Sequence, residues 1–367
     1  MGFKCGIVGL PNVGKSTIFN AITNAGAEAA NYPFCTIDPN VGMVSVPDSR
    51  FDKLVASFKP RAVLPTVTQF VDIAGLVKGA SQGEGLGNQF LTHIRECEAI
   101  MEVVRCFEDE NIVHVHGSVD PLRDVEIIET ELLLKDMDSL DKRMVIENRN
   151  ARVGVGVASA KMRLDACEKL KNAMSEGTPA RRLLGDSETM DELISDLALL
   201  TAKPMFYCAN VSDDEMLTGN AHVDVLRKYA EAQGSSVVII CGKIEEELSS
   251  MEPEEKQEFL KDLGMAESGL DSVIRKGYSL LGLRTYFTAG EKEVRAWTFE
   301  AGWKAPACAG VIHTDFERGF IRAETLSYKD FEKCGSWNAA KEAGLLRTEG
   351  KEYEVEDGDI LHFLFNV

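Results

Sequence analysis

The sequence predicts an α/β fold in which a mostly parallel sheet is combined with a helical insertion and a small C-terminal α+β domain. Three observations support this fold class: apolar β-like runs alternate with helical patterns, one interval interrupts the alternation, and the end of the chain has a pattern of its own. Alternating strands and helices favour a parallel sheet covered by helices on both faces. The chain has 367 residues, which is long enough for two or three domains.

The predicted strands of the parallel sheet are short apolar runs. They cover Lys4–Val8, Thr66–Asp72, Ile100–Phe107, Pro204–Ala209 and Ser236–Cys241. Ligands of such sheets bind at the carboxyl ends of the strands. Polar residues that directly follow these strands can therefore converge on one site, although they are far apart in the sequence.

The interval from Asp124 to Leu200 interrupts the alternation and predicts an inserted pair of helices. Apolar residues recur at helical spacing in Glu129–Arg149 and, less regularly, in Ala158–Met174. Residues 152–157, which are rich in Val and Gly, are the expected turn between the two helices.

The chain after about Tyr278 predicts a separate domain that mixes strands and helices. Strands are expected at Arg295–Phe299 and Ile360–Phe365, and a helix at Pro306–Phe316. Asp357-Gly358-Asp359 forms a turn before the final strand.

Composition and cysteine usage indicate a soluble protein of the cytoplasm. Apolar residues make up 44% and charged residues 27% of the chain, and no apolar run reaches membrane-spanning length. The first strand begins so early that we expect no signal peptide. Nine dispersed cysteines without a C-x-x-C pair predict reduced, mostly buried thiols rather than disulfides or a zinc site.

The net charge of −19 argues against non-specific nucleic-acid binding by the whole surface, but the charge is uneven. Residues 142–182 contain ten Lys and Arg against four Asp and Glu. Residues 245–271 contain ten Asp and Glu against two Lys. Each stretch is compatible with a solvated helix face, which is the usual meaning of a charge run. The basic stretch is also a candidate nucleic-acid contact because it opposes the sign of the whole chain.

The segment Gly9–Ser16 matches the phosphate-binding loop pattern G-x-x-x-x-G-K-[ST]. It lies between a predicted strand and a predicted helix, which places a helix N-terminus behind the phosphates. Lys15 supplies a charge for the β- and γ-phosphates, and the Ser16 hydroxyl can bind Mg²⁺. The alternative is a glycine turn that fits the pattern by chance. The predicted nucleotide-binding residues of this loop are Asn12, Val13, Gly14, Lys15, Ser16 and Thr17.

Two further residues complete a predicted Mg²⁺ site with Ser16. Asp72 opens Asp72-Ile73-Ala74-Gly75, which fits D-x-x-G directly after a strand; the aspartate holds a water of Mg²⁺ and the Gly75 N–H reaches the γ-phosphate. Thr36 lies between the phosphate loop and Asp72, where a switch threonine binds Mg²⁺ in related hydrolases. The glycine-rich segment 81–87 then predicts a mobile switch loop or a flexible surface loop.

The residue that orients the attacking water is not evident. Leu76 stands where Ras-type enzymes have glutamine, and leucine can neither donate nor accept a hydrogen bond. His114 and His116 follow the strand Ile100–Phe107, and either could orient or activate water. The alternative is that both are ordinary loop histidines.

The base-binding residues are expected after the strand Pro204–Ala209. Asn210-Val211-Ser212-Asp213 corresponds to the N-K-x-D signature of GTPases, in which the aspartate reads guanine. Val211 replaces the lysine that stacks on the purine, which weakens the case for strict guanine selection. Cys241-Gly242-Lys243 stands in the place of the last base-contacting loop, so Lys243 is a further candidate contact.

With these residues assembled, the chain resembles the YchF subfamily of Obg-related translation-factor NTPases, also called Obg-like ATPases. The resemblance spans nearly the whole length. It is carried by G-L-P-N-V-G-K-S-T, N-Y-P-F-C-T-I-D-P-N, D-I-A-G-L-V-K-G-A-S, G-E-G-L-G-N-Q-F-L and V-V-R-C-F. It implies a P-loop G domain with an OBG-type fold (residues 1–278), a helical coiled-coil insertion at about 124–200, and a C-terminal TGS domain of β-grasp type (residues 280–366).

The resemblance also implies an activity and partners. The family prefers ATP over GTP, uses Mg²⁺, lacks the catalytic glutamine and uses a histidine that corresponds here to His114. Its base motif is N-x-x-E, whereas this chain has Asp213 in the last position. Asn12 can help hold K⁺ beside the phosphates in some relatives, or it is a structural loop residue. Lys15 and Gly75 would assist His114 in hydrolysis.

The implied partner is the ribosome, with the large subunit and ribosomal RNA as the expected contacts of the basic stretch. We expect a monomer with no membrane contact. The leading interpretation is a slow ATPase whose nucleotide state controls ribosome association. Two alternatives stay open: a nucleotide-gated ribosome-binding module with incidental hydrolysis, and a true GTPase, which Asp213 favours.

Overall fold

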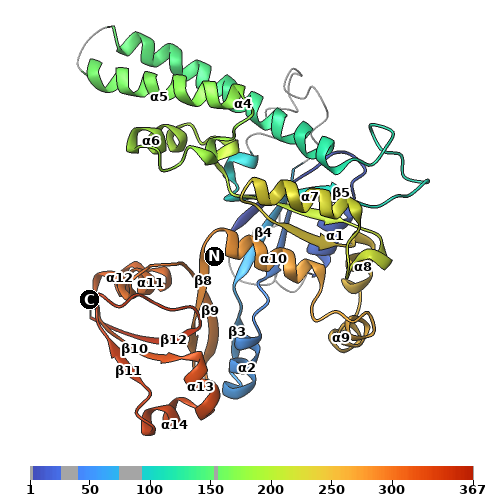
Figure 1. Cartoon of the computed structure of the whole chain (residues 1–367). Coiled ribbons are helices and arrows are strands. Elements are labelled where there is room, and N and C mark those ends of the chain that lie inside the picture. Colours follow the sequence, from blue (N-terminus) through green and yellow to red (C-terminus); the bar gives the residue numbers. More distant parts are fainter. Residues whose placement is uncertain (1–2, 26–39, 74–92, 153–155, 367) are drawn as a thin grey trace.

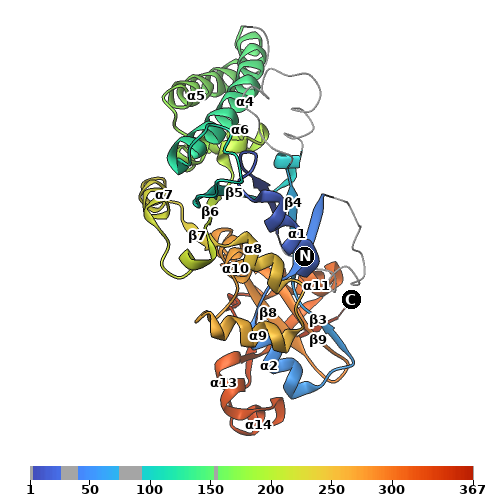
Figure 2. The same ribbon diagram turned by 90° about the vertical axis from the view of Figure 1, so that its right-hand side faces the viewer.

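A computed structural model describes residues 3–25, 40–73, 93–152 and 156–366. The chain forms a first domain around one six-stranded sheet, a helical insertion and a second domain around another six-stranded sheet, with the first domain in the middle (Figures 1 and 2). The predicted α/β fold class is confirmed. The predicted Thr36, Gly75, Leu76 and segment 81–87 lie outside the described residues.

The first sheet has the strand order β2-β4-β1-β5-β6-β7. Its strands are β1 Lys4–Val8, β2 Val41–Ser45, β4 Val67–Asp72, β5 Ala99–Arg105, β6 Met205–Asn210 and β7 Val237–Ile240. All neighbouring strands are parallel except β2, which is antiparallel to β4. The helices of this domain are α1 Lys15–Ala25, α7 Ala221–Ala232, α8 Gly242–Leu248, α9 Pro253–Asp262 and α10 Gly269–Leu280.

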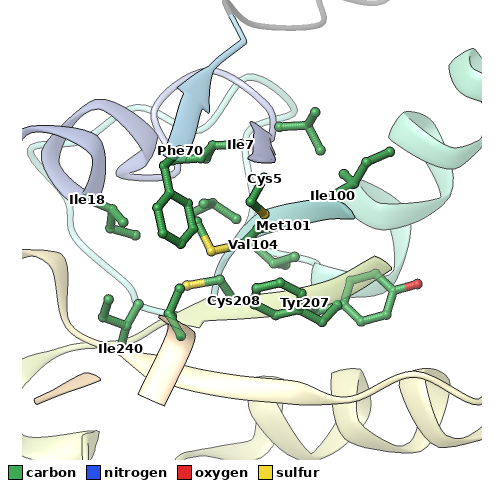
Figure 3. Packing of buried hydrophobic residues seen from close by; sticks show 14 of the residues in the cluster. Cys5, Ile7, Ile18, Phe70, Ile100, Met101, Val104, Tyr207, Cys208 and Ile240 are labelled. Atoms are coloured by element: carbon green, nitrogen blue, oxygen red, sulfur yellow. The ribbon is translucent and has the colours of Figure 1, made fainter. Parts of the chain in front are cut away.

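The core of the first domain follows from the apolar character of its central strands. Every residue of β5 and of β6 is buried, as expected for parallel strands covered on both faces. Side chains from neighbouring strands and from α1 interdigitate in this core (Figure 3). The exceptions to the apolar pattern are Glu102 and Arg105, two charged residues that are fully buried in β5.

The helical insertion projects from the first domain as an arm (Figure 1). It comprises α4 Pro121–Asn150, α5 Val157–Ser175 and α6 Glu188–Asp196, with the short 3₁₀ turns η3 Ala180–Arg182 and η4 Leu200–Ala202. Helix α4 begins earlier than predicted because Asp120 caps it, accepting a hydrogen bond from the Arg123 N–H, and Pro121 occupies the first turn. The arm has a hydrophobic core of its own, which includes Leu140, Leu170 and Leu193.

A partly buried polar cluster joins the base of the arm to the first domain. The Glu129 carboxylate on α4 accepts hydrogen bonds from the hydroxyls of Tyr207 (2.7 Å) and Tyr229 (2.6 Å) and pairs with Arg181 (3.3 Å). These partners come from β6, α7 and η3, so the carboxylate links the arm to the sheet and to a helix beside it.

The second sheet has the strand order β11-β10-β12-β8-β9-β3. Its strands are β8 Leu283–Ala289, β9 Glu293–Glu300, β10 Phe320–Ser327, β11 Arg347–Glu349 and β12 Asp359–Phe365, together with β3 Ala62–Leu64. Its helices are α11 Ala305–Ile312, α12 Thr314–Arg318, α13 Tyr328–Cys334 and α14 Trp337–Glu342. The hairpin β8–β9 and the parallel contact of β8 with β12 give the β-grasp arrangement.

A segment of the first domain belongs to this second sheet. Strand β3 pairs with β9 in parallel, and α2 Ser49–Phe58 packs on the face formed by β8 and β9. The Phe51 ring of α2 stacks on Phe287 with 6.3 Å between ring centroids, and Arg50 pairs with Asp357. In Figure 1 this segment lies among the elements of the second domain. The domain boundaries drawn from the sequence do not include this exchange.

Candidate nucleotide-binding site

A cavity of about 1030 Å³ lies at the carboxyl ends of the strands of the first sheet. Its lining comes from the segments that follow β1, β4, β5, β6 and β7: Leu10, Pro11, Asn12, Gly14, Lys15, Ser16, Thr17, Asp72, Phe107, Glu108, Asp109, Ile112, Asn210, Val211, Ser212, Asp213, Cys241, Gly242, Lys243 and Glu246. The structure therefore brings together most of the residues that the sequence predicted to bind a nucleotide.

The phosphate loop owes its shape to two residues in the left-handed region. Asn12 has φ 63° and Gly14 has φ 92°. A side chain at Gly14 would place its Cβ 2.1 Å from the Asn210 amide nitrogen, so only glycine fits there. Helix α1 starts at Lys15, and the N–H groups of its first turn have no acceptor within the helix. Such a helix start attracts phosphate groups.

The Lys15 ammonium forms an ion pair with the Asp72 carboxylate at the end of β4. This pair connects the phosphate loop to the predicted Mg²⁺ ligand across the cavity. Ser16 is exposed on the first turn of α1 and also lines the cavity. A hydroxyl and a carboxylate at one cavity edge fit Mg²⁺, which takes one or two protein oxygens and completes its shell with phosphate and water. Within the described ranges, no group of three His, Cys, Asp or Glu residues could hold a metal ion.

Asn210 joins the two ends of the cavity. Its amide nitrogen donates to the Val13 carbonyl at 2.9 Å, and its amide oxygen accepts from the Gly242 N–H at 3.0 Å. The side chain is buried, so both bonds are shielded from water. Asn210 therefore holds the phosphate loop and the loop after β7 in a fixed relation.

The predicted base-contacting residues lie at the other end of the cavity. Val211 is buried, and its N–H donates to the Ile240 carbonyl at 2.9 Å. The Asp213 carboxylate lies 3.9 Å from the Lys243 ammonium, and both side chains are more than half exposed. Val211, Asp213 and Lys243 all line the cavity.

His114 lies outside the cavity. Its imidazole is buried, with Nε2 2.8 Å from a carboxylate oxygen of Asp124 and Nδ1 accepting from the His116 N–H at 3.1 Å. Since Nδ1 is an acceptor, Nε2 carries the proton and donates to Asp124. His116 does not line the cavity either.

One wall of the cavity was not predicted from the sequence. It is formed by Phe107, Glu108, Asp109 and Ile112, which follow β5. The Asn12 amide reaches this wall and donates to the Val113 carbonyl at 3.1 Å. The signal that could have found it is Arg105, a charged residue at the end of a strand that is apolar except for Glu102.

Glu245 lies on α8, the helix that also carries Lys243. The side chain is buried on α8 and accepts a hydrogen bond from the Gly269 N–H at 2.8 Å, at the start of α10. Burial raises the pKa of this carboxyl to about 7, although the N–H groups of Gly269 and Leu270 act in the opposite direction. The carboxyl thus joins the base end of the cavity to the helix that leads into the second domain.

Fold and site together define a P-loop nucleotide-binding protein with a G-domain core. Residues 4–146 match the sequence model MMR_HSR1, described as "50S ribosome-binding GTPase", and residues 283–366 match YchF-GTPase_C, described as a "Protein of unknown function". The chain belongs to the YchF family.

Similar proteins cover the chain from end to end. It is 56% identical to "Ribosome-binding ATPase YchF" of Bacillus subtilis and 54% identical to the protein of that name from Escherichia coli O157:H7; each comparison covers 100% of both chains. The solved structure of the Schizosaccharomyces pombe YchF GTPase matches with a TM-score of 0.87 and 42% identity, covering 99% of this chain and 98% of that one. Among the described residues, no helix has the length and apolarity needed to cross a membrane.

Proposed function

We propose that this chain is a Mg²⁺-dependent nucleotide hydrolase that prefers ATP over GTP and acts as a nucleotide-controlled switch on the ribosome. The observation that carries the proposal is the convergence of Lys15, Ser16 and Asp72 on one cavity behind a helix start. The curated bacterial relatives are named ribosome-binding ATPases, which supports the same activity.

At the phosphate end, Lys15 would leave Asp72 and bind the β- and γ-phosphates. Ser16 and Asp72 would hold Mg²⁺, which would supply positive charge to offset the charge of the phosphates. Thr36 is proposed as a further ligand and the Gly75 N–H as a contact of the γ-phosphate. Asn12 is proposed to help hold K⁺ beside the phosphates. In this structure its side-chain amide donates a hydrogen bond to the Val113 carbonyl instead.

At the base end, two features support the preference for ATP. Val211 offers an apolar surface where guanine-specific enzymes have a lysine, and the Asp213 carboxylate faces the Lys243 ammonium. Guanine needs a free carboxylate as acceptor for its N1 and N2 protons. The relatives differ on this point in their names, since the solved S. pombe protein is called a GTPase.

We propose His114 as the group that orients the attacking water. Because it is buried against Asp124 in this structure, it would have to move before it could reach the γ-phosphate. A move of this kind would make hydrolysis slow until a partner promotes it, in agreement with a switch.

The proposed ribosome contact is the arm, which would bind ribosomal RNA of the large subunit. Six of the ten cations in residues 142–182 bond within the chain: Arg143, Arg163, Lys169, Lys171, Arg181 and Arg182. The other four, Lys142, Arg149, Arg152 and Lys161, are exposed on the arm and bond to no described residue, and the last three lie near the end of α4 and the start of α5. Four free cations on a chain of net charge −19 would orient its approach to RNA. We further propose that the protein acts as a monomer in the cytoplasm, where its partner, the ribosome, is found.

The experiment that tests the proposal is nucleotide hydrolysis and affinity with Lys15→Ala beside Lys256→Ala, a change on α9 far from the phosphate loop. Lys15→Ala should abolish hydrolysis, and the control should not change it. Titrations of ATP and GTP, with and without ribosomes, measure the preference. Wild-type turnover in Lys15→Ala would refute the hydrolase, and tighter binding of GTP would show a true GTPase.

A second candidate function is a nucleotide-gated ribosome-binding module in which hydrolysis is incidental. The withdrawn position of His114 favours this candidate. His114→Ala separates the two functions, with the exposed His362→Ala of β12 as control. If hydrolysis falls about a hundredfold while nucleotide-dependent ribosome binding and cellular function persist, the binding module is the better description.

A further inference from the structure

Arg105, the last residue of β5, is among the largest fully buried side chains. Its guanidinium donates three hydrogen bonds to backbone carbonyls of the segment that follows: Nε to Phe107 (3.1 Å), Nη2 to Asp109 (3.2 Å) and Nη1 to Ile112 (2.8 Å). No carboxylate among the described residues pairs with it. Burial of a cation without an ionic partner carries a desolvation cost, which these hydrogen bonds to carbonyl oxygens offset in part.

The guanidinium also lies over the Phe107 ring, 4.6 Å from the ring centroid. One wall of the nucleotide cavity is formed by four residues of the segment that the guanidinium bonds: Phe107, Glu108, Asp109 and Ile112. Apart from Arg105, few bonds hold this wall, and the one ion pair that its residues form within the described part of the chain, between Glu108 and His222 of α7 at 3.5 Å, is largely exposed on the Glu108 side. Bonds within it run from the Ile112 N–H to the Asp109 carbonyl at 3.3 Å and from the Asn111 N–H to the Asp109 carboxylate at 2.8 Å.

We infer that Arg105 is a positioning residue that pre-orders residues 107–112 as a wall for the nucleotide and thereby sets nucleotide affinity. The inference rests on the proposed nucleotide hydrolysis and adds a residue that touches neither phosphate nor base. Without the guanidinium, three carbonyls lose their donor and the wall must be ordered during binding, which weakens affinity.

Arginine suits this task because its planar group carries five donors in a fixed fork. A lysine keeps the charge but cannot reach three carbonyls in different directions while it stacks flat on a ring. Arg105→Lys therefore tests the geometry of the group separately from its charge.

The chain contains a matched control for this change. Arg295 on β9 lies over the Trp297 ring at 3.8 Å, in the second domain. Arg295→Lys removes a similar stacking arrangement far from the nucleotide cavity. Both variants would be compared with the wild-type full-length chain for the dissociation constant of a fluorescent ATP analogue, for KM and kcat of ATP hydrolysis, and for cleavage by a Glu-specific protease.

Arg105→Lys should raise the dissociation constant of the ATP analogue about tenfold and raise KM by a similar factor. The value of kcat should stay within about twofold of the wild type, because the ground state and the transition state lose the same support. The exposed Glu108 and Glu110 should become cleavable, and nucleotide should protect them again. Arg295→Lys should leave all these quantities unchanged. If Arg105→Lys does not fold, Arg105→Gln, which has no charge to bury, carries the same expectations.

Two outcomes would overturn different statements. If the wild-type chain binds no ATP analogue, the proposed function fails. If the wild type binds it and the Arg105 variants bind equally well with no new cleavage at Glu108 or Glu110, the inference fails while the proposed function stands. A loss of thermal stability with unchanged affinity and KM would likewise show that Arg105 is only structural.

Discussion

The side-chain amide of Asn210 donates a hydrogen bond to the Val13 carbonyl at 2.9 Å and thereby ties the base end of the cavity to the phosphate loop. The residue was predicted as a base contact, and its observed bonds give it a structural role as well. The same buried side chain therefore connects the segments that we propose to bind the base and the phosphates.

Asn210→Asp should weaken the binding of ATP and GTP alike. An aspartate can still accept from the Gly242 N–H, but it places a carboxylate against the Val13 carbonyl in place of a donor. A lost buried hydrogen bond of this kind costs about 1–3 kcal/mol, or roughly fivefold to 150-fold in affinity. Fluorescence titration measures it, with the exposed Asn148→Asp of α4 as control. A variant that loses only ATP affinity would contradict the structural role.

Glu245→Gln should change how stability depends on pH. The pKa of this carboxyl is raised to about 7 in the folded chain, above its ordinary value of 4.5. Between these pH values the unfolded chain releases the proton while the folded chain keeps it, so the wild type loses stability as pH rises, by up to about 3 kcal/mol. Glutamine does not ionise and should remove this loss.

The measurement for Glu245 is urea unfolding at pH 5 and at pH 7.5. The free energy of unfolding of Glu245→Gln, relative to that of the wild type, should be higher at pH 7.5 than at pH 5. Glu247→Gln, two residues along the same helix and exposed, should follow the wild type at both pH values. A constant difference between Glu245→Gln and wild type would show that the carboxyl titrates normally.

The arm lysines without partners should contribute more to ribosome binding than those with partners. Lys142→Ala with Lys161→Ala removes two exposed cations that bond to no described residue. Lys169→Ala with Lys171→Ala removes two that already pair with Asp186 and Asp141. The double substitution of Lys142 and Lys161 should weaken ribosome binding. It should also reduce the magnitude of the slope of log affinity against log salt concentration by about one to two. Co-sedimentation with ribosomes at several salt concentrations compares them, and equal slopes would exclude the arm tip as the RNA contact.

Phe51→Ala should destabilise the chain although α2 is encoded within the first domain. The side chain is 6% exposed and stacks on Phe287, so its truncation leaves a hole in the core of the second sheet. Comparable changes cost about 3–5 kcal/mol. Chemical unfolding measures the loss, and Leu217→Ala at a surface position should stay within about 0.5 kcal/mol of the wild type. If Phe51→Ala is as mild as the control, α2 does not stabilise the second domain.

The sequence predicted the parallel sheet and the cavity edge because both depend on local patterns. Apolar runs marked the strands, and parallel strands bring the residues at their carboxyl ends together. Asp72 and Asn210 were found in this way, and the structure places both beside the phosphate loop.

Other features depend on long-range contacts that no local pattern encodes. Residues 62–64 have no sequence feature that selects β9 as their neighbour rather than a strand of the first sheet. The sequence places Arg105 at the end of an apolar strand, but its burial depends on the segment that folds over it, which no local pattern indicates. For His114, spacing indicated the loop, but only the fold shows that Asp124 holds the side chain away from the cavity.

The pairing of β3 with β9 also affects how the protein is made. During synthesis, residues 49–64 leave the ribosome more than two hundred residues before Glu293–Arg295. Until β9 has been made, β3 therefore has no strand to pair with, and the apolar face of α2 stays uncovered. This segment cannot reach its final pairing until β9 Glu293–Glu300 has been translated. A fragment that ends near residue 280 would expose this surface permanently and tend to aggregate.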